Sequence, residues 1–152
     1  MKKVIMLMLV LPLIVSCFAG CALEKTPPTY EDFVKTAEEN GLTLVDCSDQ
    51  ASDFKSCTIG HNEHFKIEFY ECFNMPDAKD VFERTKSEFE MEKDSSPVRA
   101  SGNVQASNYG TYHLKIDSAY YYVAYIGNTV LYAAVNPEYQ KDVEKIADAL
   151  GY

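Results

Sequence analysis

The chain has 152 residues, 47% hydrophobic and 24% charged, which suffices for one domain with a core and is too apolar for disorder. Its formal charge is −9. Such an acidic surface repels phosphate backbones and anionic lipid headgroups, so we expect no nucleic-acid partner and no membrane binding through a basic patch.

The first 20 residues predict an export signal. Residues 1–3 are a short basic segment, and residues 4–15 (VIMLMLVLPLIV) are all apolar and are followed by small residues. This order is the secretory signal layout. Removing the segment with Lys2 and Lys3 leaves 12 basic and 23 acidic residues, a mature charge of −11. We therefore expect the rest of the chain on the outer face of the cytoplasmic membrane.

Two cysteines compete as the processing point of this signal. Residues 14–17 (IVSC) and 18–21 (FAGC) both resemble the lipobox of bacterial lipoproteins, in which a cysteine after small residues receives a diacylglycerol. Cys17 has the better aliphatic residue upstream, whereas Cys21 has the more typical Ala-Gly step and leaves a tether over residues 21–28. We favour Cys21, with Cys17 as the alternative. Two acyl chains suffice for stable anchoring.

An uncleaved membrane helix is the other reading of this segment. Residues 4–23 carry no charge and have roughly the 20 residues that span hydrocarbon. A proline, a serine, a glycine and two cysteines crowd its second half, which suits a processing site better. Lys2 and Lys3 stay inside in either topology, so the domain faces outward.

The domain over residues 29–152 begins with a helix and three strands. Residues 29–32 (TYED) form a capping box directly after two prolines, so a helix begins there, and Gly41 ends it. Three strands follow, over residues 42–46, 57–59 and 65–70. Alternation in the last strand turns three side chains toward the core: Phe65, Ile67 and Phe69.

A second helix, a meander and a third helix complete the domain. Pro76 stands in the first turn of the second helix, whose apolar side is formed by Ala78, Val81, Phe82, Thr85 and Phe89. From Val98 onward, strand-like runs are separated by turn signals at residues 108–110, 117–118 and 127–128. Asn136 and Pro137 begin the final helix, whose buried stripe is Tyr139, Val143, Ile146, Ala147 and Leu150.

These elements predict an α+β domain with the order α-βββ-α-ββββ-α. Its short connections imply an antiparallel sheet of about six or seven strands, with three helices packed on it.

Three short motifs span the domain: Thr29-x-Glu31-x-Phe33, IEFY at residues 67–70 and LGY at residues 150–152. With the lipobox and the short linker, the chain resembles small lipoproteins common in anaerobic Gram-positive bacteria. The resemblance implies location and fold, and it implies no activity. The second cysteine in the signal region departs from the usual single lipobox.

A C-x3-H-x2-H cluster is formed by Cys57, His61 and His64, with Glu63 inside it. Thiolate and imidazole are good zinc ligands, and a tight turn can bring three of them together. However, no fourth ligand has suitable spacing, and a solvated hairpin tip explains the same residues. We expect no metal and no cofactor, with His61 and His64 as weak candidates.

Three cysteines belong to the folded part: Cys47, Cys57 and Cys72. A disulfide is permitted outside the cell. Cys47 and Cys57 flank one loop between adjacent strands, and closing so short a loop stabilises by roughly 2–3 kcal/mol. Cys72 could replace either partner, so three pairings stay open. In an anaerobic habitat all three would be plain thiols.

Tyrosines gather in the strand over residues 119–126. Alternation puts Tyr121 and Tyr125 on one face, and Tyr120 and Tyr122 on the other. We expect one face to pack under helices. The other face is a candidate binding platform for a sugar, peptide or protein, because tyrosine offers apolar area with a polar tip. The alternative is that tyrosine is simply a good strand former.

No catalytic motif stands out: P-loop, Gly-rich phosphate loop and G-x-S-x-G patterns are all missing from the sequence. We therefore expect a lipid-anchored, non-catalytic module that binds an envelope protein, a peptide or a glycan. A small extracellular hydrolase or metal-dependent enzyme using His61 and His64 is the alternative. A third reading is an accessory domain that docks through its sheet edge.

Overall fold

The structure, a computed structural model, describes residues 24–94 and 96–152. The expected signal segment and both lipobox cysteines, Cys17 and Cys21, lie outside these residues. Within the described ranges, no helix combines the length and hydrophobicity needed to cross a bilayer.

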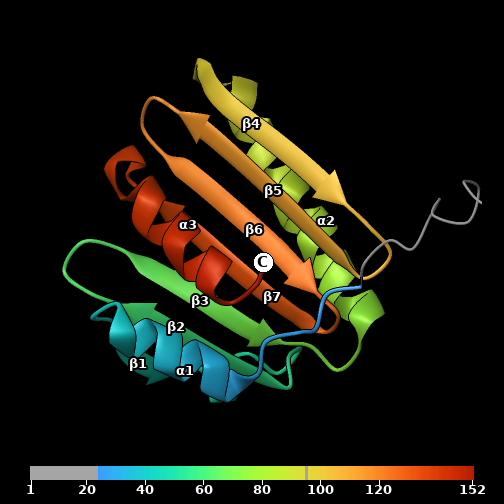
Figure 1. The fold of residues 1–152 in the computed structure, drawn as a ribbon. Coiled ribbons are helices and arrows are strands. Elements are labelled where there is room, and N and C mark those ends of the chain that lie inside the picture. Colours follow the sequence, from blue (N-terminus) through green and yellow to red (C-terminus); the bar gives the residue numbers. More distant parts are fainter. Residues whose placement is uncertain (1–23, 95) are drawn as a thin grey trace, which may run out of the picture.

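The predicted element order and fold class are confirmed (Figure 1). The elements are α1 (Tyr30–Glu39), β1 (Thr43–Asp46), β2 (Ser56–His61), β3 (Lys66–Glu71), α2 (Met75–Met91), β4 (Val98–Gln105), β5 (Tyr109–Ile116), β6 (Tyr120–Ile126), β7 (Thr129–Val135) and α3 (Gln140–Ala149). Short 3-10 turns lie at Ser48–Gln50, Glu92–Asp94 and Pro137–Tyr139.

Local sequence signals explain where the helices begin. Thr29 and Asp32 form the predicted capping box: the Asp32 N–H donates to Thr29 Oγ1 at 3.1 Å, and the Thr29 N–H donates to Asp32 Oδ2 at 2.8 Å. Asn74 caps α2 by accepting from the Asp77 N–H at 3.0 Å. The prediction for the last helix is three residues early, because Pro137 opens a 3-10 turn and α3 begins at Gln140.

All strands lie in one antiparallel sheet with the order β1-β2-β3-β7-β6-β5-β4. The chain builds β1 to β3, crosses by α2 to the far edge, and returns strand by strand to β7. The junction between the two halves, β3 against β7, is short. It has four residue pairs, whereas β6 and β7 share seven.

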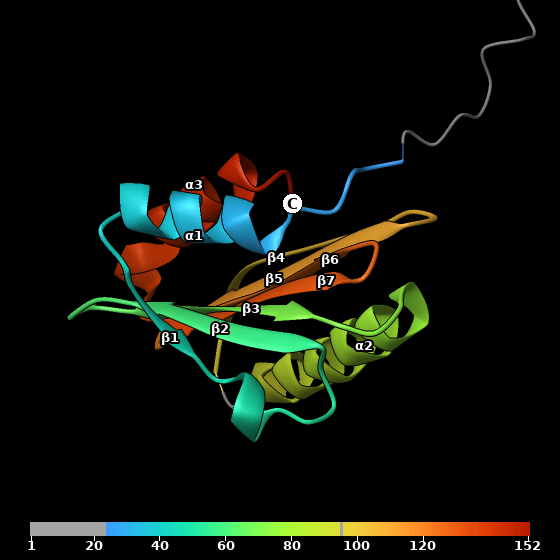
Figure 2. The same cartoon turned by 90° about the horizontal axis from the view of Figure 1, so that it is seen from below.

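Helices cover both faces of the sheet (Figure 2). On one face α1 and α3 pack on a cluster that includes Phe33, Ile67, Phe69, Tyr120, Tyr122 and Ile146. On the other face α2 contributes Phe82 and Phe89 to a cluster with Tyr112, Leu114, Val123 and Tyr125 of the sheet. The core positions predicted for Ile67 and Phe69 are confirmed. The expectation of one uncovered face is wrong, because α2 crosses the sheet on the side opposite α1 and α3.

The described part of the tether is docked on the domain. The Lys25 N–H donates to Asn108 Oδ1 at 3.2 Å, and Asn108 Nδ2 donates back to the Lys25 carbonyl at 2.7 Å. Lys25 Nζ also donates to the Gly151 carbonyl at 2.7 Å. Pro27 rests against Gly127, where an added Cβ would lie 2.5 Å from the proline ring. The chain thus enters at the sheet end that carries the β4–β5 and β6–β7 turns (Figure 1).

Candidate functional site

The sheet opens at the end opposite the tether. Pairing between β3 and β7 runs from Glu71 with Thr129 to Glu68 with Tyr132 and stops there. Yet β3 begins two residues earlier, at Lys66, and β7 continues to Val135. We call this opening the notch; it is bounded by Phe65–Ile67 on one side and Ala133–Val135 on the other.

Backbone groups face into the notch from both strands. The Cys72 N–H donates to the Asn128 carbonyl, and backbone groups alternate in direction along a strand. Every second residue of β3 counted back from Cys72 therefore directs its N–H and C=O toward β7. Lys66 is one of them. On β7 the residue of matching register is Ala134, whose backbone groups point away from β6. Lys66 and Ala134 would be the next hydrogen-bonded pair of the ladder, but they are not paired.

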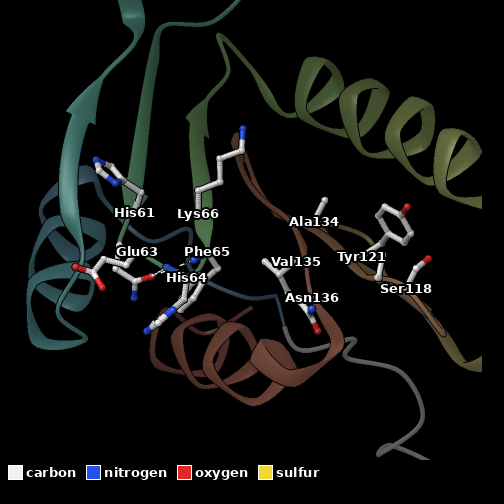
Figure 3. Close-up of a pocket in the computed structure, with 12 residues that line it drawn as sticks. His61, Glu63, His64, Phe65, Lys66, Ser118, Tyr121, Ala134, Val135 and Asn136 are labelled. Atoms are coloured by element: carbon white, nitrogen blue, oxygen red, sulfur yellow. Dashed lines mark hydrogen bonds between the residues drawn. The ribbon is translucent and has the colours of Figure 1, made fainter.

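A cavity of about 500 Å³ occupies the notch (Figure 3). Its walls come from the β2–β3 hairpin, the β5–β6 turn and the end of β7. Lys66 and Tyr121 extend on the α2 side of the sheet, whereas Phe65 and Val135 lie on the α3 side. The remaining lining residues are mostly polar: His61, Asn62, Glu63, His64, Ser118, Ala119, Ala134 and Asn136.

The hairpin tip beside the notch is ordered by Asn62. Its Oδ1 accepts from the N–H groups of His64 and Phe65, at 2.9 and 3.0 Å. This is an Asx turn, in which a side-chain oxygen accepts the hydrogen bonds that a backbone carbonyl would otherwise accept. The His64 ring stacks on Tyr139, with 5.4 Å between ring centres.

The hypothesis of a Cys57, His61, His64 metal set is wrong for Cys57. Its sulfur is bonded to Cys47, so no thiolate remains to ligate an ion. Over residues 24–94 and 96–152, no group of three or more His, Cys, Asp or Glu side chains could hold a metal ion. His61 and His64 both line the notch instead.

Glu68 lies next to the notch, on the α2 side of the sheet. Among the described residues it is the only charged residue that is buried, with 9% of its surface exposed. Lys66 Nζ donates to its Oε1 at 2.7 Å, and the Tyr70 hydroxyl donates to its Oε2 in a short hydrogen bond. Burial, followed by this bond to the carboxylate, raises the pKa of Tyr70, and the same carboxylate raises the pKa of Lys66.

The Glu68 cluster faces a second cavity of about 300 Å³ under α2. Thr85 and Glu88 of α2 and Tyr132 of β7 are among its lining residues. Lys66 lines both this cavity and the notch, so the two spaces adjoin at its side chain. The carboxylate thus holds Lys66 at the mouth of the notch.

The predicted tyrosine face, made of Tyr120, Tyr121, Tyr122 and Tyr125, needs correction. Alternation assigned the faces properly, but Tyr120, Tyr122 and Tyr125 are only 1%, 5% and 1% exposed. Helices cover both sides of β6, so these rings are core. The Tyr120 hydroxyl donates to Glu144 Oε1 of α3 at 3.1 Å. Tyr121 is half-buried, packs on Phe89 and lines the notch.

Cys47 and Cys57 form a disulfide, which is one of the three pairings left open by the sequence. It closes the loop between β1 and β2 at one edge of the sheet. Cys72 is a free, buried thiol, and burial raises its pKa to about 11. A thiol held protonated in this way is unreactive.

The notch itself escaped sequence reasoning. A weak signal was present in KIEFYE (residues 66–71), where Lys66, Glu68 and Tyr70 alternate with core residues. Two charged side chains on one face of a central strand indicate a polar interruption of the core. Nothing in the sequence indicates where pairing between β3 and β7 ends.

Fold and site together define a class: a small α+β domain with a helix-covered sheet and a polar notch at one strand junction. No protein-family model matches the chain, and no curated protein matches its sequence. A solved structure, the crystal structure of a GTP binding regulator from Thermotoga maritima, is similar over 82% of this chain and 90% of that one. The identity is 10% and the TM-score is 0.47.

Proposed function

We propose that the protein is a lipid-anchored extracytoplasmic module that binds a partner at the notch and is not an enzyme. The export signal and the lipobox at Cys21, with Cys17 as the alternative, support the location. The Cys47–Cys57 disulfide also supports it, because such bonds persist in oxidising compartments.

One observation carries the binding role: the notch leaves two register-matched positions, Lys66 and Ala134, unpaired inside a polar cavity. Backbone N–H and C=O groups require partners, and sheet edges are ready templates for another chain. Tyr121 and Phe65 add ring surface on opposite sides of the opening. The partner class remains the one expected from the sequence: an envelope protein, a peptide or a glycan.

A small hydrolase or metal-dependent enzyme is the alternative function. It would have to use His61 and His64 without the Cys57 thiolate. Measuring zinc in the purified domain separates the two functions, because a stoichiometric ion that is lost in His61→Ala would favour the enzyme.

Two experiments test the proposal. Cells expressing the full chain are labelled with palmitate; we expect label in the membrane fraction, and its loss in Cys21→Ser. Cys17→Ser is the matched control. If the unaltered chain takes up no label, or if it is found in the cytosol, the anchor is contradicted. A pull-down from solubilised membranes, using residues 24–152 and Tyr121→Ser, tests binding at the notch. An unchanged set of recovered partners contradicts that site.

A further inference from the structure

The notch presents backbone groups on a rigid strand. Seven residue pairs with β6 fix β7, and six pairs with β2, including His61 with Lys66, fix β3. Ala134 has no strand partner on its β3 side among the described residues, and it is flanked by the buried Ala133 and Val135. A peptide main chain carries donor and acceptor at the spacing that continues an antiparallel ladder.

The local charge differs from that of the whole molecule. The chain has a formal charge of −9, yet two of its three histidines, His61 and His64, line the notch together with Lys66. Glu63 is the acidic residue among the lining side chains. Glu68 engages one Lys66 donor, but the lysine side chain is 57% exposed, and an ammonium has three donors. Lys66 and Glu63 cancel in formal charge, so the lining is neutral where the whole chain is acidic, and the remaining Lys66 donors are available to a ligand carboxylate.

Side chains on the two sides of the notch suit a strand-like ligand. Successive side chains of an extended peptide point to opposite faces. One set would meet Tyr121 on the α2 side, and the other would meet Phe65 and Val135 on the α3 side. The chemistry at the notch is thus a backbone template with ring surface on each side and an amine at the mouth.

From this arrangement we infer that the notch binds an extended peptide that carries a carboxylate, such as a free C-terminus, and that the peptide backbone pairs with Ala134 of β7. This rests on the proposed binding role and names its ligand class. Lys66 receives the carboxylate, and it is held in place by Glu68.

The test uses the full chain in detergent micelles and titrates it with synthetic peptides while backbone amide NMR shifts are followed. The probes are a six-residue peptide of alternating valine and threonine with a free carboxylate, the same peptide with a C-terminal amide, and an analogue N-methylated at alternate residues. We expect shifts at Ala134 with the first, affinity lower by about tenfold with the second, and no binding with the third. Absence of shifts with the free-carboxylate peptide at millimolar concentration overturns the inference, as does equal binding of the N-methylated peptide.

A matched pair of variants removes the backbone donor of β7. Ala134→Pro lacks the N–H, which does not serve the β6 ladder, whereas Ala134→Ser keeps it. We expect peptide binding to be lost in the first and retained in the second. If Ala134→Pro does not fold, the N-methylated peptide tests the same bond on the unaltered protein. Oligomers of N-acetylglucosamine form a separate arm: binding of these without peptide binding keeps the notch as a site but overturns the peptide.

Discussion

The Cys47–Cys57 bridge gives a stability prediction that can be worked from the structure. The bonded residues are 10 positions apart, and closing such a loop in the unfolded chain removes about 2.7 kcal/mol of entropy at 25 °C on the chain-entropy relation. Two hydrogen bonds join the same ends of the loop without using sulfur: the Cys47 N–H donates to the Cys57 carbonyl at 2.9 Å, and the Cys57 N–H donates to Ser48 Oγ at 3.0 Å. We expect both to persist when the disulfide is reduced. The loss therefore acts through the unfolded state.

Thermal unfolding of residues 24–152 with and without reductant measures this contribution. We expect reductant to lower Tm by about 10 °C, since one kcal/mol corresponds to roughly 3–5 °C in a domain of this size. The double variant Cys47→Ser, Cys57→Ser should match the reduced protein and should not respond to reductant. Cys72→Ser is the control, because it must retain the response. A change in Tm below about 2 °C on reduction refutes the loop-closure reasoning.

Three further predictions concern other parts of the domain. The Tyr125 hydroxyl is buried and has no hydrogen-bond partner among the described residues, so Tyr125→Phe should leave the free energy of unfolding unchanged or raise it by up to about 1 kcal/mol. Tyr120→Phe loses the bond to Glu144 and should lower the free energy of unfolding by about 1 kcal/mol; urea titrations measure both. A Cβ at Gly102 would lie 2.4 Å from His113 Cε1, so Gly102→Ala should lower the free energy of unfolding by about 1 kcal/mol. This loss should vanish in a His113→Ala background, and a loss that persists there would exclude the contact as its cause. Buried tyrosine hydroxyls stay protonated in the folded state, whereas tyrosines of the unfolded chain ionise near their ordinary pKa of about 10. The free energy of unfolding is thus fully present below about pH 10 and falls above it. Urea titrations across that range, with tyrosinate absorbance, measure this fall. Stability that stays constant into strong alkali would contradict this assignment, which rests on burial raising the pKa of Tyr70, Tyr120, Tyr122 and Tyr152.

Local signals were enough to predict the order of the elements. The capping box at Thr29, the proline at position 76 and the hairpin turn at residues 127–128 each act within a few residues, so the sequence displays them directly. Burial of β6 on both faces could also have been expected, because residues 120–126 are tyrosine or aliphatic throughout, as in central strands covered on both sides.

The site depended on relations between distant residues, which one sequence does not reveal. Lys66 and Ala134 are separated by most of the domain, and whether they pair depends on the relative twist of the two sheet halves. The choice among three cysteine pairings likewise required the distance between Cα atoms, which is 5.1 Å for Cys47 and Cys57.

The docked segment at Lys25 has a geometric consequence for a lipid-anchored protein. Three residues separate Cys21 from Lys25, so acylation at Cys21 would place the lipid four positions along the chain from the hydrogen bonds between Lys25 and Asn108. The notch opens at the opposite ends of β3 and β7, about 25 Å along strands of this length from the end where Lys25 is docked. A peptide bound at the notch would then contact the end of the sheet that lies farthest from the lipid-bearing segment.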